Sequence, residues 1–144
     1  MNLLAIVIVG FVILESTNVI ALYFFPDSKY ANSVGTFRAW EKSKQDPEVH
    51  DFVRYLVNWV AGTKIIFLLL LVVILLTADA EGLFYTGVAM ALAIATFFWR
   101  LFPLVRRMDR EGQIDPSGYS KVLGAMIAAM VLLFVVALVV TGVA

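Results

Sequence analysis

Apolar residues fill four long stretches of this chain, and polar residues gather in the segments between them. An α-helix rises roughly 1.5 Å per residue, so about 20 apolar residues cross the hydrocarbon core of a bilayer, which is roughly 30 Å thick. Each of the four stretches reaches that length. The pattern predicts membrane-spanning helices at about residues 3–25, 56–77, 83–102 and 120–142.

The stretches lack the polar face that a helix of a water-soluble bundle needs. The segment Val131–Val140, for example, contains no polar side chain. The whole chain of 144 residues is 62% hydrophobic and 15% charged, which is too apolar for a soluble domain of this length. We therefore predict an all-α fold in which residues 1–144 form a single transmembrane domain, an antiparallel bundle of four membrane-spanning helices.

Proline marks the boundaries of the predicted helices. A proline follows helices one and three, and an Asp-Pro pair precedes helices two and four: Pro26, Asp46-Pro47, Pro103 and Asp115-Pro116. An aspartate followed by proline is a helix start signal, because the side chain caps the first turn and proline fits that turn. The repetition hints at two parallel hairpin repeats, as in some transporters, although ordinary helix capping produces the same spacing.

Positive charge is distributed unevenly along the chain. Lysine and arginine concentrate in about residues 26–51 and 103–118 and at their flanks, whereas the turn at Asp79 and Glu81 and both chain ends carry none. The positive-inside rule then places both long loops in the cytoplasm and both termini outside a plasma (inner) membrane. The formal net charge is zero, so no basic field indicates a nucleic-acid partner.

Two ionisable residues, Glu15 and Lys64, lie within predicted spans, where a lone charge is costly. Counted from Leu3 and Thr77 on the same side of the membrane, they lie about 18 Å and 20 Å deep. Opposite charges at one depth relieve each other's desolvation, so we predict a Glu15–Lys64 pair with Asn18 one turn away. The cluster could bind a proton, cation or polar substrate. Alternatively it only joins two helices, or Lys64 extends to the interface.

The first loop, residues 26–51, contains a short apolar pattern. Val34, Phe37 and Trp40 recur at helical spacing behind Ser33, which could serve as an N-cap. We predict a short helix lying in the membrane interface, with Trp40 at the headgroup boundary. A gate or a partner-docking element is the alternative interpretation.

The arginines that follow the third span are candidate lipid contacts. We expect the helix to continue past Pro103 and to stop at Glu111-Gly112. This extension carries three arginines that could bind anionic lipid headgroups: Arg106, Arg107 and Arg110. The alternative is that they only determine the topology.

The chain offers little catalytic chemistry. It has no cysteine, and its one histidine, His50, has no second histidine to form a metal site, so we expect it to be solvated at the surface. No nucleophile, paired carboxylates or metal ligand set can be recognised. We therefore predict no metal, no cofactor and no enzymatic activity.

The favoured function is a small transporter or channel built around Glu15 and Lys64. In having four spans and a glutamate in the first, the chain resembles the small multidrug transporters, but their first loop is short and we assign no family. Gly87 and Ala91 recur at a spacing typical of close helix contacts, and we expect a homo-oligomer in the lipid bilayer. A non-catalytic scaffold or accessory subunit is the alternative, and a lipid-modifying enzyme ranks third.

Overall fold

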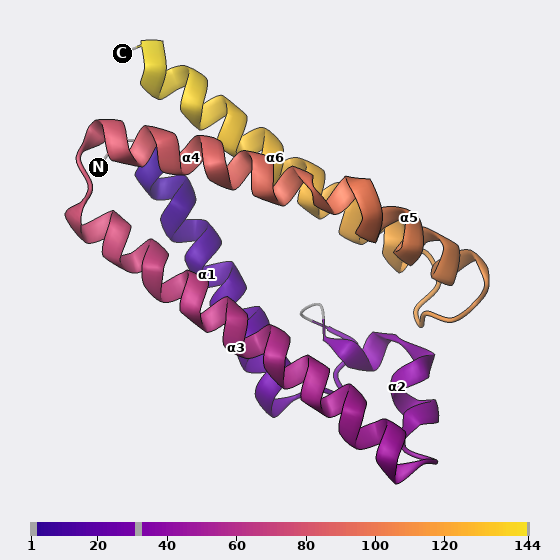
Figure 1. Cartoon of the computed structure of the whole chain (residues 1–144). Coiled ribbons are helices and arrows are strands. Elements are labelled where there is room, and N and C mark those ends of the chain that lie inside the picture. The colour runs from indigo at the N-terminus through magenta and orange to yellow at the C-terminus, as the bar shows by residue number, and fades with distance from the viewer. Residues whose placement is uncertain (1–2, 31–32, 144) are drawn as a thin grey trace.

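The regular structure of this chain is helical. The computed structural model describes residues 3–30 and 33–143, and Figure 1 shows the order of its elements. The helices are α1 (Leu3–Phe24), η1 (Val34–Thr36), α2 (Arg38–Ser43), α3 (Pro47–Thr77), α4 (Ala80–Ala95), α5 (Phe97–Arg110) and α6 (Tyr119–Val143). Four stretches, namely α1, α3, α4 with α5, and α6, are long and apolar enough to cross a membrane. The prediction of an all-α, four-span bundle is confirmed.

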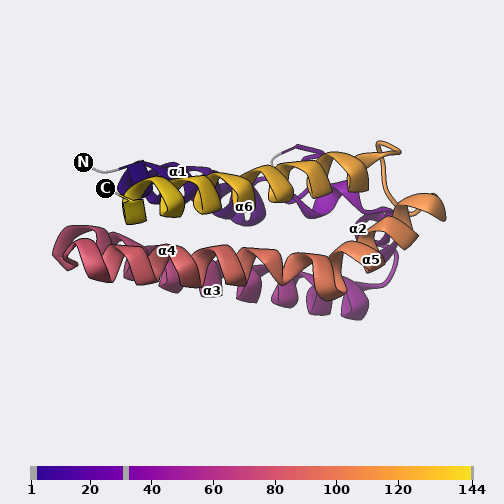
Figure 2. The ribbon, with the colours of Figure 1, turned by 90° about the horizontal axis from the view of Figure 1, so that it is seen from above.

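The helices run antiparallel in two pairs. Figure 1 shows α1 beside α3, and α4 with α5 beside α6. Seen from above in Figure 2, α1 and α6 form one layer, whereas α3, α4 and α5 form the other. Both termini and the short α3–α4 turn lie at one end, the terminal end. Both long loops lie at the opposite end, the loop end, so the chain has the hairpin order that its apolar pattern predicts.

Several helix boundaries follow the local sequence. The Asp46 side chain caps α3 by accepting hydrogen bonds from the amides of Glu48 and Val49, as predicted. Helix α5 ends at Arg110, and Gly112, two residues beyond, adopts a φ of 69° that favours glycine. Residues 103–110, which the sequence placed in the second loop, are therefore helical. The continuation of the helix through Pro103 to this stop is confirmed.

The predicted start of the fourth helix at Asp115 is wrong. Helix α6 begins at Tyr119, and its first turn is capped by Asp109 from the end of α5. The Asp109 carboxylate accepts hydrogen bonds from the amides of Gly118 and Ser120 and from the Ser120 hydroxyl. Asp115 instead forms an ion pair with Lys29 of the first loop. Asp115 thus binds Lys29, from another part of the chain, instead of capping the helix that follows it.

The first loop also differs from its prediction. Ser33 does not cap with its side chain, because its hydroxyl donates to the carbonyl oxygens of Phe25 and Pro26. One 3₁₀ turn follows, then Phe37 is extended, and only afterwards does α2 begin. Trp40 is 3% exposed, so it packs inside the loop, and its ring is not free to contact lipid headgroups.

A core at the terminal end joins all four spans. The terminal-end core consists of eight buried side chains: Leu4, Ile8, Phe11, Leu71, Met90, Ala91, Phe134 and Ala137. Gly87 permits this packing, because a Cβ atom there would lie 2.7 Å from a methyl group of Leu4 and 3.1 Å from one of Leu138. The small residues of α4 therefore serve helix contacts within the chain.

A smaller core and two backbone hydrogen bonds join the helix pairs at the loop end. The loop-end core contains Val105, Ile114 and Leu123 of the second pair, and Phe37 of the first loop packs against it. Beside it, the Arg38 amide donates to Gln113 O at 2.9 Å, and the Asp115 amide donates to Thr36 O at 2.9 Å. These two bonds form an antiparallel bridge between the first and second loops, which we call the loop tie.

Candidate functional site

The predicted ion pair within the membrane is present. The Lys64 amine of α3 donates to Glu15 Oε2 of α1 at 2.6 Å and to Asn18 Oδ1 at 2.5 Å. The Lys64 and Glu15 side chains are 28% and 21% exposed, and Asn18 is buried. All three residues of the candidate polar site therefore meet.

The cluster does not extend to the neighbouring hydroxyl groups. The Ser16 and Thr17 hydroxyls donate to backbone carbonyls one turn earlier in α1, at 2.7 and 3.1 Å. Glu15 bonds to Lys64 through Oε2 alone, and its Oε1 accepts no hydrogen bond from the residues that the structure describes. One carboxylate oxygen thus stays available to a ligand.

This ion pair borders a groove between α1 and α6. The groove has a volume of about 980 Å³ and is lined by α1, α6 and parts of both loops. Helix α1 contributes Gly10, Ile13, Glu15 and Asn18, and α6 contributes apolar side chains that include Met126. The groove therefore combines apolar walls with a small group of polar atoms, as ligand sites commonly do.

The two ends of the groove are built differently. Toward the terminal end, Phe11 and Phe134 of the terminal-end core lie edge to face and close the space between the helices. At the loop end, the groove reaches Lys29 and Asp115, which are paired and about half exposed. The Lys29 ammonium, by hydrogen bond and by charge, holds the pKa of the Asp115 carboxyl below its usual range.

A second cavity, of about 480 Å³, lies at the α3–α4 turn. Its lining is apolar except for Asp79, whose carboxylate caps α4 by accepting from the Gly82 amide. This lining contains one carboxylate, at the start of a helix, and none of the residues that line the cavity is a cation paired with it.

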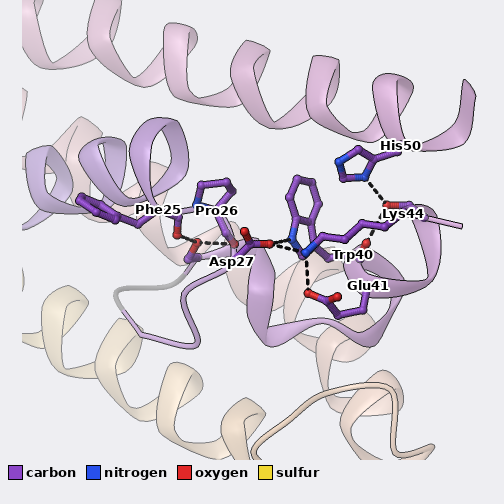
Figure 3. Close-up of polar contacts among 9 residues, drawn as sticks. Phe25, Pro26, Asp27, Trp40, Glu41, Lys44 and His50 are labelled. Carbon is purple, nitrogen blue, oxygen red and sulfur yellow. Dashed lines mark hydrogen bonds and ion pairs between the residues drawn. The ribbon is translucent and has the colours of Figure 1, made fainter. Parts of the chain in front are cut away.

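Polar contacts hold the first loop against the ends of α1 and α3 (Figure 3). Asp27 Oδ1 accepts hydrogen bonds from the Trp40 indole and the Lys44 amine, both at 2.6 Å, and Lys44 also pairs with Glu41. The hydrogen bonds from Lys44 and then Trp40 lower the pKa of Asp27. The same contact with Asp27, followed by that with Glu41, raises the pKa of Lys44. These bonds explain why Trp40 turns inward.

His50 belongs to the same region and is half-buried, contrary to the expectation of surface solvation. Its Nδ1 lies 2.9 Å from the Ser43 hydroxyl, which donates to Trp40 O, and its ring lies 4.8 Å from the Trp40 ring (Figure 3). Among the described residues, no group of three His, Asp or Glu side chains could hold a metal ion. The contacts of His50 with Ser43 and Trp40 make it part of the packing of the first loop.

The predicted lipid contacts lie on the outside of α5. Arg106, Arg107 and Arg110 are exposed, and they form no ion pair within the described part of the chain. Val105 on the same helix is buried in the loop-end core. The structure thus separates these arginines from the groove and leaves them facing the surroundings.

Sequence reasoning missed the groove, its Gly10 wall and the Lys29–Asp115 pair. Lys29 and Asp115 are far apart in the chain, and neither has a neighbour that indicates its partner.

No protein-family model, curated protein or solved structure matches this chain. The four apolar helices make it a multi-pass integral membrane protein. Its task must be argued from the groove and the ion pair.

Proposed function

We propose that this protein is a small membrane transporter whose substrate binds in the groove at Glu15, Asn18 and Lys64. The observation that carries the proposal is the position of the ion pair, which borders an open groove of about 980 Å³. Ionisable side chains at membrane depth commonly mark substrate or ion pathways when they face a cavity.

A purely structural contact between helices explains the pair less well. Such a contact needs the charges enclosed and their remaining hydrogen-bonding groups satisfied, because an unsatisfied buried group is costly. Glu15 instead lines the groove and keeps Oε1 without a donor among the described residues. This arrangement supports a binding role.

The closed terminal end favours a carrier over a channel. A channel needs a continuous path through the membrane, whereas the terminal-end core occupies the space between α1 and α6 beyond Phe11. The groove reaches only the loop end, which the arginine and lysine distribution predicts to be cytoplasmic. We therefore regard this arrangement as the form of the carrier that opens toward the cytoplasm of a plasma-membrane protein.

The surroundings that we propose for the carrier are an anionic bilayer and further copies of the chain. The three exposed arginines of α5 fit anionic lipid headgroups, since no side chain in the described part of the chain neutralises them. Ala125, Ala128 and Ala129 of α6 are exposed, and small residues in such a row allow a second copy to approach closely. These features support a homo-oligomer in contact with lipid phosphates.

Reconstitution into sealed liposomes tests the transporter proposal. Internal pyranine reports proton movement, and dithionite quenching of fluorescent lipid analogues reports movement of amphiphiles. We expect movement of at least one probe above that in protein-free vesicles, reduced about tenfold or more by Glu15→Gln. Rates equal to those of empty vesicles, or rates unchanged by Glu15→Gln, would contradict the proposal. A stoichiometric partner recovered together with inactive protein would favour the scaffold alternative.

A further inference from the structure

The walls of the groove are exposed at membrane depth. Ile13 on α1 is 64% exposed, and Val122 and Met126 on α6 are 59% and 53% exposed. Figure 2 shows that these two helices belong to one layer of the bundle, and the groove lining includes no residue from the described α3, α4 or α5. Because both walls are membrane-spanning helices, a ligand can enter sideways from the lipid.

The charges of the groove are balanced. Glu15 is paired with Lys64, and at the loop end Lys29 is paired with Asp115. A ligand with a net charge would add an uncompensated charge to a site of low dielectric constant, which is costly. The groove therefore favours a ligand without net charge.

The available polar atom specifies the head of that ligand. An ionised carboxylate only accepts hydrogen bonds, so Glu15 Oε1 requires a donor. An uncharged donor that is compatible with the balanced charges is a hydroxyl group. The apolar side chains around it require the remainder of the ligand to be apolar.

The size of the groove agrees with such a molecule. Its volume of about 980 Å³ lies at the upper end of the range of small-molecule sites, about 300–1,000 Å³, and far exceeds what a bare ion occupies. Beyond Glu15 the groove passes Gly10, where an added Cβ atom would have no other atom within 4 Å. This part provides open space for an apolar chain.

We propose that the groove between α1 and α6 binds a neutral amphiphile from the lipid phase. A hydroxyl group of its head donates to Glu15 Oε1, and its apolar chain runs along α1 past Gly10. This inference rests on the proposed function in using the same groove and names the class of substrate. It is a claim about binding, so its test needs no gradient and no transport.

The test uses two photoactivatable probes with the same diazirine-bearing acyl chain, a monoacylglycerol and an alkylammonium. The full-length protein is placed in phosphatidylcholine nanodiscs at neutral pH, irradiated with each probe, and digested for mass spectrometry. We expect the monoacylglycerol to label peptides of α1 and α6 at least fivefold more than the alkylammonium. Equal or preferential labelling by the alkylammonium would overturn the assignment of a neutral ligand.

Two variants separate binding in the groove from contact with lipid. Gly10→Phe places a ring in the groove at a position where the added Cβ atom meets no other atom within 4 Å, and it should reduce labelling more than tenfold. Ile20→Phe, exposed on α1 outside the groove, should leave labelling unchanged. Replacing the pair together, as Glu15→Leu with Lys64→Leu, removes the acceptor but keeps the charge balance and should reduce labelling about tenfold. Labelling that survives Gly10→Phe, or cross-links between two copies through the groove instead, would overturn the proposal.

Failure here is distinct from failure of the transporter proposal. Absent labelling with Glu15-dependent flux would reject the amphiphile and keep the transporter. Specific labelling without any flux would keep the binding site and reject transport.

Discussion

The terminal end and the loop end of the bundle contain segments of the same membrane-spanning stretches, yet they pack in different ways. At the terminal end, α1, α3, α4 and α6 all contribute to one apolar core, in which Leu4, Ile8 and Phe134 are completely buried. At the loop end, the two helix pairs separate (Figure 1), and they are connected through the loops, the loop-end core and the exposed Lys29–Asp115 ion pair.

The difference in packing between the two ends explains the position of the polar site at Glu15 and Lys64. Close contact of α4 with α1 and α6 depends on Gly87, where any side chain would meet Leu4 and Leu138. Nearer the loop end, the groove opens between α1 and α6, and Glu15 finds its counter-ion on its own pair partner, α3. The ion pair thus holds one pair together, while the space beside it remains open.

The largest effect should come from opening the terminal-end core. Phe134→Ala removes a completely buried ring that contacts Phe11, so we expect a loss of about 3–5 kcal/mol in the free energy of unfolding. Its control is Leu133→Ala, which alters an exposed neighbour on the same helix. Unfolding in mixed micelles with increasing denaturing detergent measures both. Equal losses would show that this end is not a packed core.

Breaking the ion pair should rank next. Glu15→Leu leaves the Lys64 ammonium without its counter-ion in a largely buried position, which should cost about 3 kcal/mol. Combining it with Lys64→Leu removes both charges, and most of the stability should return. The same unfolding assay compares the single and double variants. If the double variant were as unstable as Glu15→Leu alone, the pairing of charges would not explain the loss.

The same substitution at two glycines compares the ends directly. Gly87→Leu forces atoms into Leu4 and Leu138 and should cost about 1–3 kcal/mol, whereas Gly10→Leu extends into the groove and should change stability little. Thermal unfolding of both variants in one detergent measures the difference. A comparable loss at Gly10 would mean that the groove is filled by packed side chains.

The smallest effect on global stability should come from the exposed Lys29–Asp115 pair. Asp115→Asn should leave the unfolding transition nearly unchanged, but it should speed hydrogen exchange at the two backbone amides of the loop tie, those of residues 38 and 115. The variant therefore tests the loop end alone.

Lowering the pH should have the same effect on the loop tie as Asp115→Asn, because protonation also removes the negative charge of Asp115. The pKa of Asp115 is lower in the folded chain than its ordinary value of 3.8, so pairing with Lys29 contributes above that value. The contribution is lost as the pH falls from about 3.8 through the lower folded value. If the amides of the loop tie exchanged as slowly in Asp115→Asn as in the unsubstituted protein, the two backbone hydrogen bonds would hold the loops together without the ion pair.

Regular helix geometry explains which predictions succeeded. A constant rise per residue allowed the depths of Glu15 and Lys64 to be compared, and the structure joins them at 2.6 Å. The Asp46 cap and the stop at Gly112 also depend only on residues within one turn. Features determined by helix rise and local capping could therefore be read from the sequence.

Features that depend on distant partners could not be read in this way. Asp115 has the local pattern of a cap, but Lys29 binds its carboxylate and Asp109 caps α6 instead. Trp40 suits the interface, but Asp27 accepts its indole hydrogen. The groove depends on the separation of the two helix pairs. The sequences of α1 and α6 contain no local pattern that indicates this separation.

The loop tie has a consequence for how the protein is made. Its two hydrogen bonds join segments that leave the ribosome at different times, since the second loop is synthesised only after α1, α3, α4 and α5. The α1–α3 hairpin, including its ion pair, can therefore assemble in the membrane before α6 exists. Contact between Phe37 and Ile114 then forms only when α4 and α5 have inserted and returned the chain to the side of the first loop. Protection of the loop tie would accordingly report that α4 and α5 have crossed the membrane and brought the second loop beside the first.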